Sequence, residues 1–474
     1  MMELKLAFPE IFVATMACVV LVADLYVSER RRGLVHFLAI LGLIFASIIT
    51  GSHMAAEGER AVAFHGTFVR DMMGDVLKQL SYLLLGIILV YSKHYLREFK
   101  LYRGEFYALC LFALLGVMVL ISAGSMLTVY LGLELISLSS YALVALNRDN
   151  TRSAEAAMKY FVLGSLASGL LLYGMSMLYG VTGTLELTEI ANRVPWTDNL
   201  LATFALVFIV IGIGFKLGAV PFHMWVPDVY HGAPAAVTLL ISSLPKLAAF
   251  AMAYRLLENG MGPLQEHWES MLIILSALSL IIGNLVAIAQ TNIKRMLAYS
   301  TISHMGFMLL GMLAGDAQGY AAAMHYAIVY TLMSAGAFGV LIFLSKAGVE
   351  AENLDDFKGL NQRSPWFAFV MLMLMASMAG VPVFIGFFAK LLVIQAVINA
   401  GHIWLAILAV IFSVVGAYYY LRIVKLMYFD DAETDQAINV PMDFRAVLSL
   451  NGASMLVLGI FSNALIALCV ASFS

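Results

Sequence analysis

The stretch FKLGAVPFHMWVPDVYHGAP, from Phe215 to Pro234, combines features that seldom occur together. It lies within a long apolar segment, yet it contains a lysine, two histidines, an aspartate and three prolines. Lipid tolerates such a segment only where protein or a water-filled cavity surrounds it, because the hydrocarbon cannot satisfy polar groups. Lys216 stands five residues before Pro221. An intramembrane lysine beside a proline break therefore indicates a transport site.

The composition around this stretch is that of a membrane protein. Of the 474 residues, 62% are hydrophobic and only 12% are charged, and the mean hydropathy is +0.91. Apolar runs of about 20 residues recur along the whole chain, and each can cross roughly 30 Å of hydrocarbon as a helix. We therefore predict an all-α polytopic membrane protein.

Counting the apolar runs predicts about fourteen transmembrane helices in one continuous bundle. No linker or low-complexity segment separates them, and the first helix lacks the flanks of a cleaved signal, so we expect it to be retained. The predicted spans are 9–28, 34–53, 72–92, 105–122, 125–146, 156–181, 200–227, 233–257, 270–290, 296–314, 319–345, 366–399, 402–428 and 447–472.

Basic residues concentrate in alternate loops. The odd-numbered loops are rich in lysine and arginine, whereas the even-numbered loops contain little beyond Arg60, Arg70 and Arg193. Cytoplasmic loops carry an excess of lysine and arginine. The pattern therefore predicts an amino terminus outside the cytoplasm, and fourteen helices would place the carboxyl terminus on the same side.

Glycine and proline interrupt the seventh and twelfth helices. The seventh helix contains VIGIGFKLGAVPF, and we predict that it is broken at Pro221 and again at Pro227. The twelfth helix contains MAGVPVFIGFFAKLL, and we predict that it is broken at Pro382. Corresponding interrupted helices in two halves are typical of inverted-repeat transporters with a site near the midplane. Two unrelated proline kinks would give the same pattern. On the repeat interpretation the chain divides into 1–104 (helices one to three), 105–257 (first repeat, helices four to eight), 258–428 (second repeat, helices nine to thirteen) and 429–474 (a loop and helix fourteen).

Five of the ionisable residues within predicted helices are candidates for a transport pathway. A charge there costs at least a few kcal/mol unless it is paired or hydrated. Burial disfavours the charged form of a lone lysine and a nearby carboxylate favours it, so a lysine whose partner comes and goes is a switchable proton site. Static salt bridges are the alternative, but buried pairs stabilise weakly, and five groups on five helices favour a proton or cation pathway. The five residues are Glu134, Lys159, Lys216, Lys246 and Lys390.

Three positions allow a second interpretation. Lys159, near the cytoplasmic start of the sixth helix, can instead extend its ammonium to the interface. His304 and His325, in helices ten and eleven, suit a proton relay because imidazole titrates near neutrality. Alternatively, either histidine could be packed in the core and donate a hydrogen bond to a backbone carbonyl.

Motifs for cofactors are missing from the sequence. Cys18, Cys110 and Cys469 are far apart and form no CxxC or Cys/His cluster, which argues against disulfides, zinc and iron–sulfur clusters. No GxGxxG after a strand and no GxxxxGK[ST] occurs. We expect no cofactor, metal or nucleic acid to bind this chain.

Several long motifs resemble one family. FKLGAVPFHMWVPDVYHGAPAAV, QTNIKRMLAYSTISHMGF and the helix around Glu134 are similar to the antiporter-like subunits of respiratory complex I, the proton-translocating NADH:quinone oxidoreductase, and to relatives in multisubunit cation/proton antiporters. The resemblance spans nearly the whole chain. It is strongest to the subunit N group, since no long lateral helix follows helix fourteen and lysine stands at Lys390, where another paralogue has glutamate.

The resemblance implies roles for the ionisable residues. Glu134 and Lys216 would form an ion pair, Lys246 would be the central relay, and Lys390 would be the exit-side site. The resemblance also places two histidines on or near a hydrated central axis, and tyrosines stand where a paralogue has a lysine in helix eleven. These residues are His304, His325, Tyr326 and Tyr330.

The resemblance also implies the setting. NADH, FMN, iron–sulfur clusters and quinone are expected on other subunits, the partners would be other membrane-arm subunits and lipid, and the location would be the bacterial inner membrane with both termini periplasmic. The working hypothesis is a proton-pumping subunit without a redox centre. The alternatives are a subunit of a cation/proton antiporter or hydrogenase-type complex, and a structural spacer that only transmits conformational change.

Overall fold

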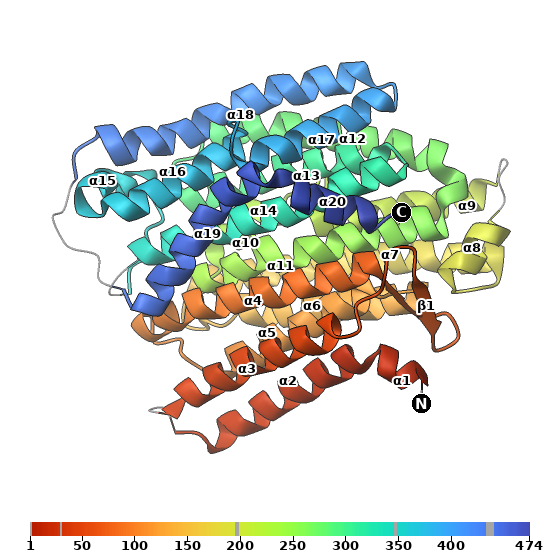
Figure 1. Cartoon of the computed structure of the whole chain (residues 1–474), viewed down its shortest axis with the longest axis horizontal. Helices are drawn as coiled ribbons and strands as arrows, with labels where there is room; N and C mark the ends of the chain where they lie inside the picture. Colours follow the sequence, from red (N-terminus) through yellow and green to blue (C-terminus); the bar gives the residue numbers. More distant parts are fainter. Residues whose placement is uncertain (1, 29–30, 195–198, 346–347, 433–439) are drawn as a thin grey trace.

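A computed structural model describes residues 2–28, 31–194, 199–345, 348–432 and 440–474. Within these ranges the chain forms a bundle of long, roughly parallel helices (Figure 1). Thirteen helices of the described residues are long and apolar enough to cross a membrane, and the shorter α16 and α17 follow one another to make a fourteenth crossing. The predicted all-α class and the number of helices are confirmed.

The order of the helices along the chain follows the predicted spans closely. The transmembrane helices begin and end within a few residues of most predicted spans. The elements are α1 (Met2–Leu6), α2 (Phe8–Tyr26), α3 (Gly33–Gly51), β1 (Arg60–Ala63), β2 (Phe68–Asp71), α4 (Met72–Glu98), α5 (Gly104–Ile121), α6 (Met126–Val144), α7 (Thr151–Thr182), α8 (Leu187–Arg193), α9 (Leu200–Leu217), α10 (Trp225–Gly232), α11 (Ala235–Tyr254), a π-turn (Arg255–Gly260), a 3₁₀ turn (Gly262–Leu264), α12 (Gln265–Ile288), α13 (Ile293–Leu313), α14 (Ala317–Leu344), a 3₁₀ turn (Leu354–Phe357), α15 (Leu360–Arg363), α16 (Pro365–Ala379), α17 (Ile385–Asn399), α18 (Ile403–Phe429), α19 (Met442–Ile460) and α20 (Ser462–Ala471).

Three helices form the centre of the bundle. The most apolar windows of α11, α13 and α14 are 100%, 94% and 89% buried, whereas those of α2, α7 and α18 are 28%, 33% and 33% buried. A helix that is apolar on all sides must be surrounded by protein or lipid. The central helices are surrounded by protein, so any polar side chain on them is held away from lipid.

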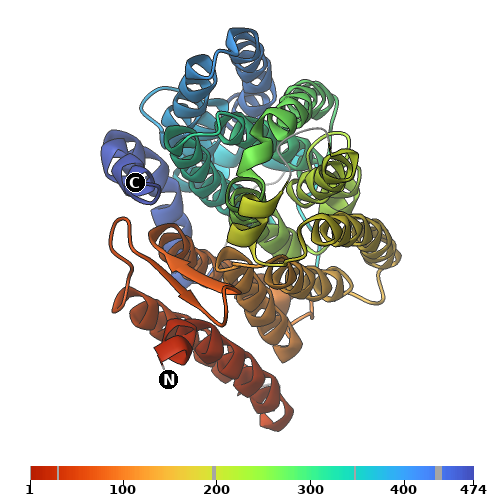
Figure 2. The same ribbon diagram turned by 90° about the vertical axis from the view of Figure 1, so that its right-hand side faces the viewer.

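An antiparallel hairpin, absent from the predicted spans, connects α3 to α4. Strands β1 and β2 pair from Arg60 opposite Asp71 to Ala63 opposite Phe68. The Asp71 carboxylate caps α4 and binds Arg255 through Nη1 at 2.6 Å and Nη2 at 2.9 Å. This ion pair fixes the hairpin against the end of α11, at the end of the bundle where both chain termini lie (Figures 1 and 2).

Both predicted broken helices are observed, and they end in the same way. Helix α9 stops at Leu217 and Gly218 follows with φ of +80°, and α16 stops at Ala379 and Gly380 follows with φ of +86°. Glycine is favoured there because a left-handed φ crowds a Cβ atom. The chain re-enters a helix at α10 and α17.

The second break predicted in helix seven is wrong. Pro227 is the third residue of α10, which continues from Trp225 to Gly232. The first N–H groups of a helix have no carbonyl partner, so a proline in the first turn removes no hydrogen bond. Pro221, by contrast, lies in the non-helical segment between α9 and α10.

Candidate functional site

Two serines and a small cavity lie beside Glu134 and Lys216. The Glu134 carboxylate accepts a hydrogen bond from the Ser168 hydroxyl of α7, and Lys216 Nζ lies 3.1 Å from Ser137 Oγ of α6. Ser137, Ser168 and Lys216 line a cavity of about 20 Å³, which is room for about one water. The direct ion pair implied by the resemblance is not formed, because no contact within 4.0 Å joins Glu134 to Lys216.

Lys246 and Lys390 each bind the end of a half-helix. Lys246 Nζ lies 3.1 Å from the carbonyl oxygen of Leu217, the last residue of α9, and Lys390 Nζ lies 2.9 Å from that of Ala379, the last residue of α16. Each ammonium also lies over an aromatic ring, 5.3 and 5.1 Å from its centre. Terminal carbonyls lack helical partners and carry partial negative charge. The breaks therefore stabilise buried lysines without a carboxylate.

One face of α14 joins α11 to α13. Tyr326, Tyr330 and Ser334 are spaced four residues apart, so they lie on the same side of the helix. Their hydroxyls contact polar groups on the two neighbouring helices. In order along α14, these contacts are Ser334–Ser242 at 3.0 Å, Tyr330–Thr301 at 2.7 Å and Tyr326–His304 at 2.7 Å.

Helix α18 continues the polar row to Lys390. The second ring nitrogen of His304 lies 3.0 Å from the hydroxyl of Tyr420, and Lys390 Nζ lies 2.9 Å from Ser413 Oγ. Ser413 and Tyr420 are seven residues apart, which is about two helical turns, so they share one face of α18. Buried lysines, hydroxyls and an imidazole thus lie on neighbouring helices from α6 to α18, in separate groups of contacts. We call these residues the central series.

The family comparison matches the region that contains this series. Residues 123–416 match the family described as "NADH:quinone oxidoreductase/Mrp antiporter, TM". NADH-quinone oxidoreductase subunit N from Thioalkalivibrio sulfidiphilus is 55% identical over 469 residues, which are 98% of this chain and 97% of the relative. The chain belongs to the NADH-quinone oxidoreductase subunit N family. Its relatives are named as subunits of a larger oxidoreductase.

Solved structures agree with the assignment to the subunit N family. A chain of respiratory complex I from Thermus thermophilus is 32% identical, with a TM-score of 0.83 over 97% of this chain and 98% of that chain. A chain of the Mrp complex from Dietzia sp. DQ12-45-1b is 21% identical, with a TM-score of 0.84 over 99% and 97%. The second likeness shows a shared fold alone.

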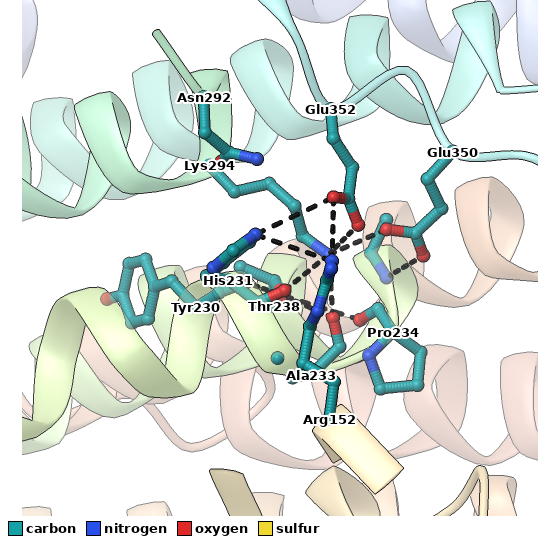
Figure 3. Close-up of polar contacts among 12 residues, drawn as sticks. Arg152, Tyr230, His231, Ala233, Pro234, Thr238, Asn292, Lys294, Glu350 and Glu352 are labelled. Carbon is teal, nitrogen blue, oxygen red and sulfur yellow. Dashed lines mark hydrogen bonds and ion pairs between the residues drawn. The ribbon is translucent and has the colours of Figure 1, made fainter. Parts of the chain in front are cut away.

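A buried ion pair between Lys294 and Glu350 holds the junction between α10 and α11 (Figure 3). Lys294 of α13, 1% exposed, places Nζ 2.6 Å from Glu350 Oε2 and 2.7 Å from the carbonyl oxygen of Ala233. Glu350 Oε1 accepts the backbone N–H of Ala235 at 2.9 Å. A residue of α13 and a loop residue after α14 therefore fix the second half of the broken helix.

Glu352 extends this cluster to α7. Arg152 Nη1 lies 3.0 Å and His231 Nε2 lies 3.6 Å from its carboxylate (Figure 3). Burial opposes ionisation of Glu352, but the close contact with His231 and the charges of Lys294, His231 and Arg152 outweigh it and lower its pKa to about 2. The carboxylate is therefore charged at neutral pH.

Lys159 and His325 lie away from the central series. Lys159, with a side chain 44% exposed, pairs with Glu155 and Asp228 at 2.9 Å each, which fits an interfacial lysine. His325 is fully buried and lines a separate cavity of about 190 Å³ with polar residues of α14 and α17. Neither ring nitrogen of His325 contacts a protein partner.

Metal-binding clusters are not found in the described ranges, where no group of three His, Cys, Asp or Glu side chains could hold a metal ion. The sequence interpretation missed Tyr420, Ser168, Glu350 and Glu352. Serine and tyrosine are common in helices, and loop carboxylates are usually solvated, so none of the four differed from its surroundings in the sequence. Only the buried Lys294 was a possible signal, because a lysine at the start of a helix without a nearby acid needs a distant partner.

Proposed function

We propose that this chain is the subunit N of a bacterial NADH:quinone oxidoreductase and that it translocates protons across the inner membrane. The observation that carries the proposal is the series of buried groups between Glu134 and Lys390. Desolvated ionisable residues inside a membrane bundle are costly, and they mark ion pathways by default. Hydroxyls and an imidazole between the lysines are groups that both donate and accept hydrogen bonds, as a proton relay requires.

The relay would start at Glu134 and Lys216, whose side chains do not form a direct ion pair. When the carboxylate approaches Lys216, its charge favours the ammonium, and when it returns to Ser168 the ammonium is less stable and releases its proton. Lys246 is the next acceptor. The proton would then pass along Ser334, Tyr330 and His304 towards Lys390 and leave on the outer side.

The driving reaction would belong to other subunits. NADH, FMN, iron–sulfur clusters and quinone are assigned to those subunits, and this chain would contribute proton translocation without a redox centre. A conformational or electrostatic signal from a neighbouring membrane-arm subunit would change the separation of Glu134 and Lys216. Both termini would face the periplasm, which the alternation of basic loops supports.

We also propose that residues 105–257 and 258–428 are inverted repeats that follow the N-terminal helices of 1–104 and precede the C-terminal part of 429–474. The equivalent endings of α9 and α16, each with a left-handed glycine and a bound lysine, support this division.

Proton pumping and quinone reduction, measured together in inverted membrane vesicles, test the function. Glu134→Ala and Lys246→Ala are expected to lower the proton gradient formed per NADH oxidised. Lys425→Ala, which alters a lysine side chain 69% exposed on α18, is the matched control. Undiminished pumping at wild-type quinone reduction in both variants would overturn the relay. Loss of assembly equal to the loss of turnover would instead favour a structural spacer.

A further inference from the structure

The indole of Trp225 contacts the sites of both Lys216 and Lys246. Trp225 is the first residue of α10 and is 3% exposed. Its ring borders the cavity of about 20 Å³ that Lys216 also lines. Lys246 Nζ lies over the same ring, 5.3 Å from its centre, but Lys246 is not among the described residues that line the cavity. The indole therefore forms the wall between the Lys216 cavity and Lys246.

The other contacts of Lys246 cannot bring it a proton. Its Nζ lies 3.1 Å from the carbonyl oxygen of Leu217 and 3.4 Å from that of Lys216. A backbone carbonyl oxygen accepts hydrogen bonds but holds no proton that it could pass on. Transfer from Lys216 Nζ to Lys246 Nζ therefore needs a water that contacts both, and the cavity has room for about one. The indole has to move before such a water can reach Lys246.

A hydrogen bond, a stacked ring and a charge hold the indole in this position. Its Nε1–H donates to the carbonyl oxygen of Phe215 in the last turn of α9, at 2.9 Å. The ring of Tyr160 of α7 stacks on it, with centroids 4.7 Å apart and planes 9° apart. The ammonium of Lys246 adds a third attraction, because a cation is drawn to the electron-rich face of tryptophan. Only this third attraction depends on charge, and it is lost when Lys246 is neutral.

We propose that Trp225 is a gate that closes behind each proton. While Lys246 is neutral, the indole is held less firmly and turns aside, so that a water links Lys216 to Lys246. The proton leaves the Lys216 ammonium, which becomes neutral, and the Lys246 amine becomes an ammonium. The new charge draws the indole back, and the proton cannot return to Lys216. This inference rests on the proposed function and adds a direction to it.

Helix α7 connects this gate to Glu134. It carries Tyr160, which stacks on the indole, and Ser168, which donates to the Glu134 carboxylate. Both side chains line the cavity beside Lys216. A displacement of α7 therefore alters the position of the carboxylate and the support of the indole together. The gate opens in the same step that changes the separation of Glu134 and Lys216.

The return of protons through the resting complex tests the gate. The purified complex is placed in proteoliposomes, a proton gradient is formed with NADH, and its decay is followed once the NADH is used up. Trp225→Phe keeps a ring but loses the N–H donor, and we expect decay about 5-fold faster than in wild type, the effect of one lost hydrogen bond on a two-state equilibrium. Trp268→Phe is the matched control, because Trp268 is also fully buried and donates to a backbone carbonyl, that of Met261, at 3.1 Å. Equal decay in the two variants would overturn the proposal.

A double variant shows whether the returning protons pass the gate. In Trp225→Phe/Lys246→Met the proton has no group to leave from beside the gate, so we expect decay as slow as in Lys246→Met alone. Decay as fast as in Trp225→Phe would reveal a leak elsewhere and would overturn the gate. The two proposals fail separately. Unchanged pumping in Lys246→Ala overturns the relay, whereas slow decay in Trp225→Phe together with lost pumping in Lys246→Ala overturns the gate alone.

Fluorinated tryptophans test the charge-dependent closing without removing the indole. Fluorine withdraws electrons from the face of the ring and weakens its attraction for a cation, while the N–H donor and the shape of the ring are largely kept. Analogues with increasing fluorine content, incorporated in place of Trp225 alone, should let the gradient decay progressively faster. The same analogues in place of Trp268 should leave the decay unchanged. Equal decay across the Trp225 series would show that Lys246 does not close the gate.

Discussion

Lys390 Nζ lies 2.9 Å from the carbonyl oxygen of Ala379, across the break between α16 and α17. The same relation joins Lys246 to Leu217 at the end of α9. A helix break thus supplies the acceptor that a buried ammonium needs, and it does so without a carboxylate that would hold the proton in place. The two breaks are therefore part of the lysine sites.

Replacing Lys390 by methionine should abolish pumping while the helix break persists. Methionine preserves much of the apolar volume but cannot carry a proton, and removing a proton-transfer group typically costs about 10²–10⁴-fold in rate. We expect the rate of proton pumping to fall to about one-hundredth of wild type or less, which is the lower limit of that range. Dye quenching in inverted vesicles measures it, with Lys425→Met as control. A wild-type gradient would exclude Lys390 from the pathway.

Ser168→Ala should alter the position of Glu134. The serine hydroxyl donates to the carboxylate, and hydrogen bonds to charged groups contribute about 1.5–3 kcal/mol. Without this bond the carboxylate is freed to approach Lys216, so we expect slower proton release and a pumping rate reduced about 10-fold, the equivalent of about 1.4 kcal/mol. Ser165→Ala, on the exposed side of the same helix, is the control. Equal rates for the two variants would contradict the prediction.

Tyr326→Phe should interrupt the series without disturbing packing. The substitution removes only the hydroxyl that lies 2.7 Å from His304 Nδ1 and keeps the buried ring. We expect lower pumping per NADH oxidised with unchanged assembly on native gels. Tyr173→Phe, at a position 56% exposed on α7, serves for comparison. Wild-type pumping in Tyr326→Phe would contradict the prediction and would show that the hydroxyl of Tyr326 is not required for the relay.

Lys294→Met should destabilise the subunit. The lysine is 1% exposed and its loss leaves Glu350 and the Ala233 carbonyl without their cation. Breaking a buried pair costs about 3–5 kcal/mol, whereas removing both charges costs less. Thermal denaturation of the purified complex should therefore show a lower midpoint for Lys294→Met and partial recovery in Lys294→Met/Glu350→Gln. A double variant as unstable as the sum of both single variants would argue against a direct pair.

Glu352→Gln should show a pH-dependent effect on stability. The folded protein lowers the pKa of Glu352 from 4.5 to about 2, so its carboxylate contributes stability that is present above pH 4.5 and is lost as pH falls towards 2. The wild type should exceed Glu352→Gln in thermal stability by a constant amount from pH 8 to pH 5, and the difference should narrow below about 4.5. A difference that narrows already between pH 8 and pH 6 would contradict the assignment of this pH dependence to Glu352.

The sequence alone was sufficient for the large-scale architecture. Transmembrane helices bury apolar runs of a fixed length, so their number followed from counting, and glycine and proline at Gly218, Pro221, Gly380 and Pro382 identified both breaks. The cost of burying charge identified Glu134, Lys216, Lys246 and Lys390 as exceptional positions. The division into repeats stays a prediction.

The packing of the helices was needed to show which groups meet. Lys246 binds a carbonyl 29 residues away, and Tyr420 contacts His304 across 116 residues. Such contacts depend on how helices pack, and serine or tyrosine in a helix gives no local signal of its partner. The composition of the stretch from Phe215 to Pro234 likewise suggested a site.

The tertiary structure determined what this stretch contacts. Its lysine, Lys216, lies beside Ser137 of α6, and the carbonyl of Leu217 binds Lys246 of α11. Lys294 of α13, paired with Glu350 of the loop after α14, fixes its end.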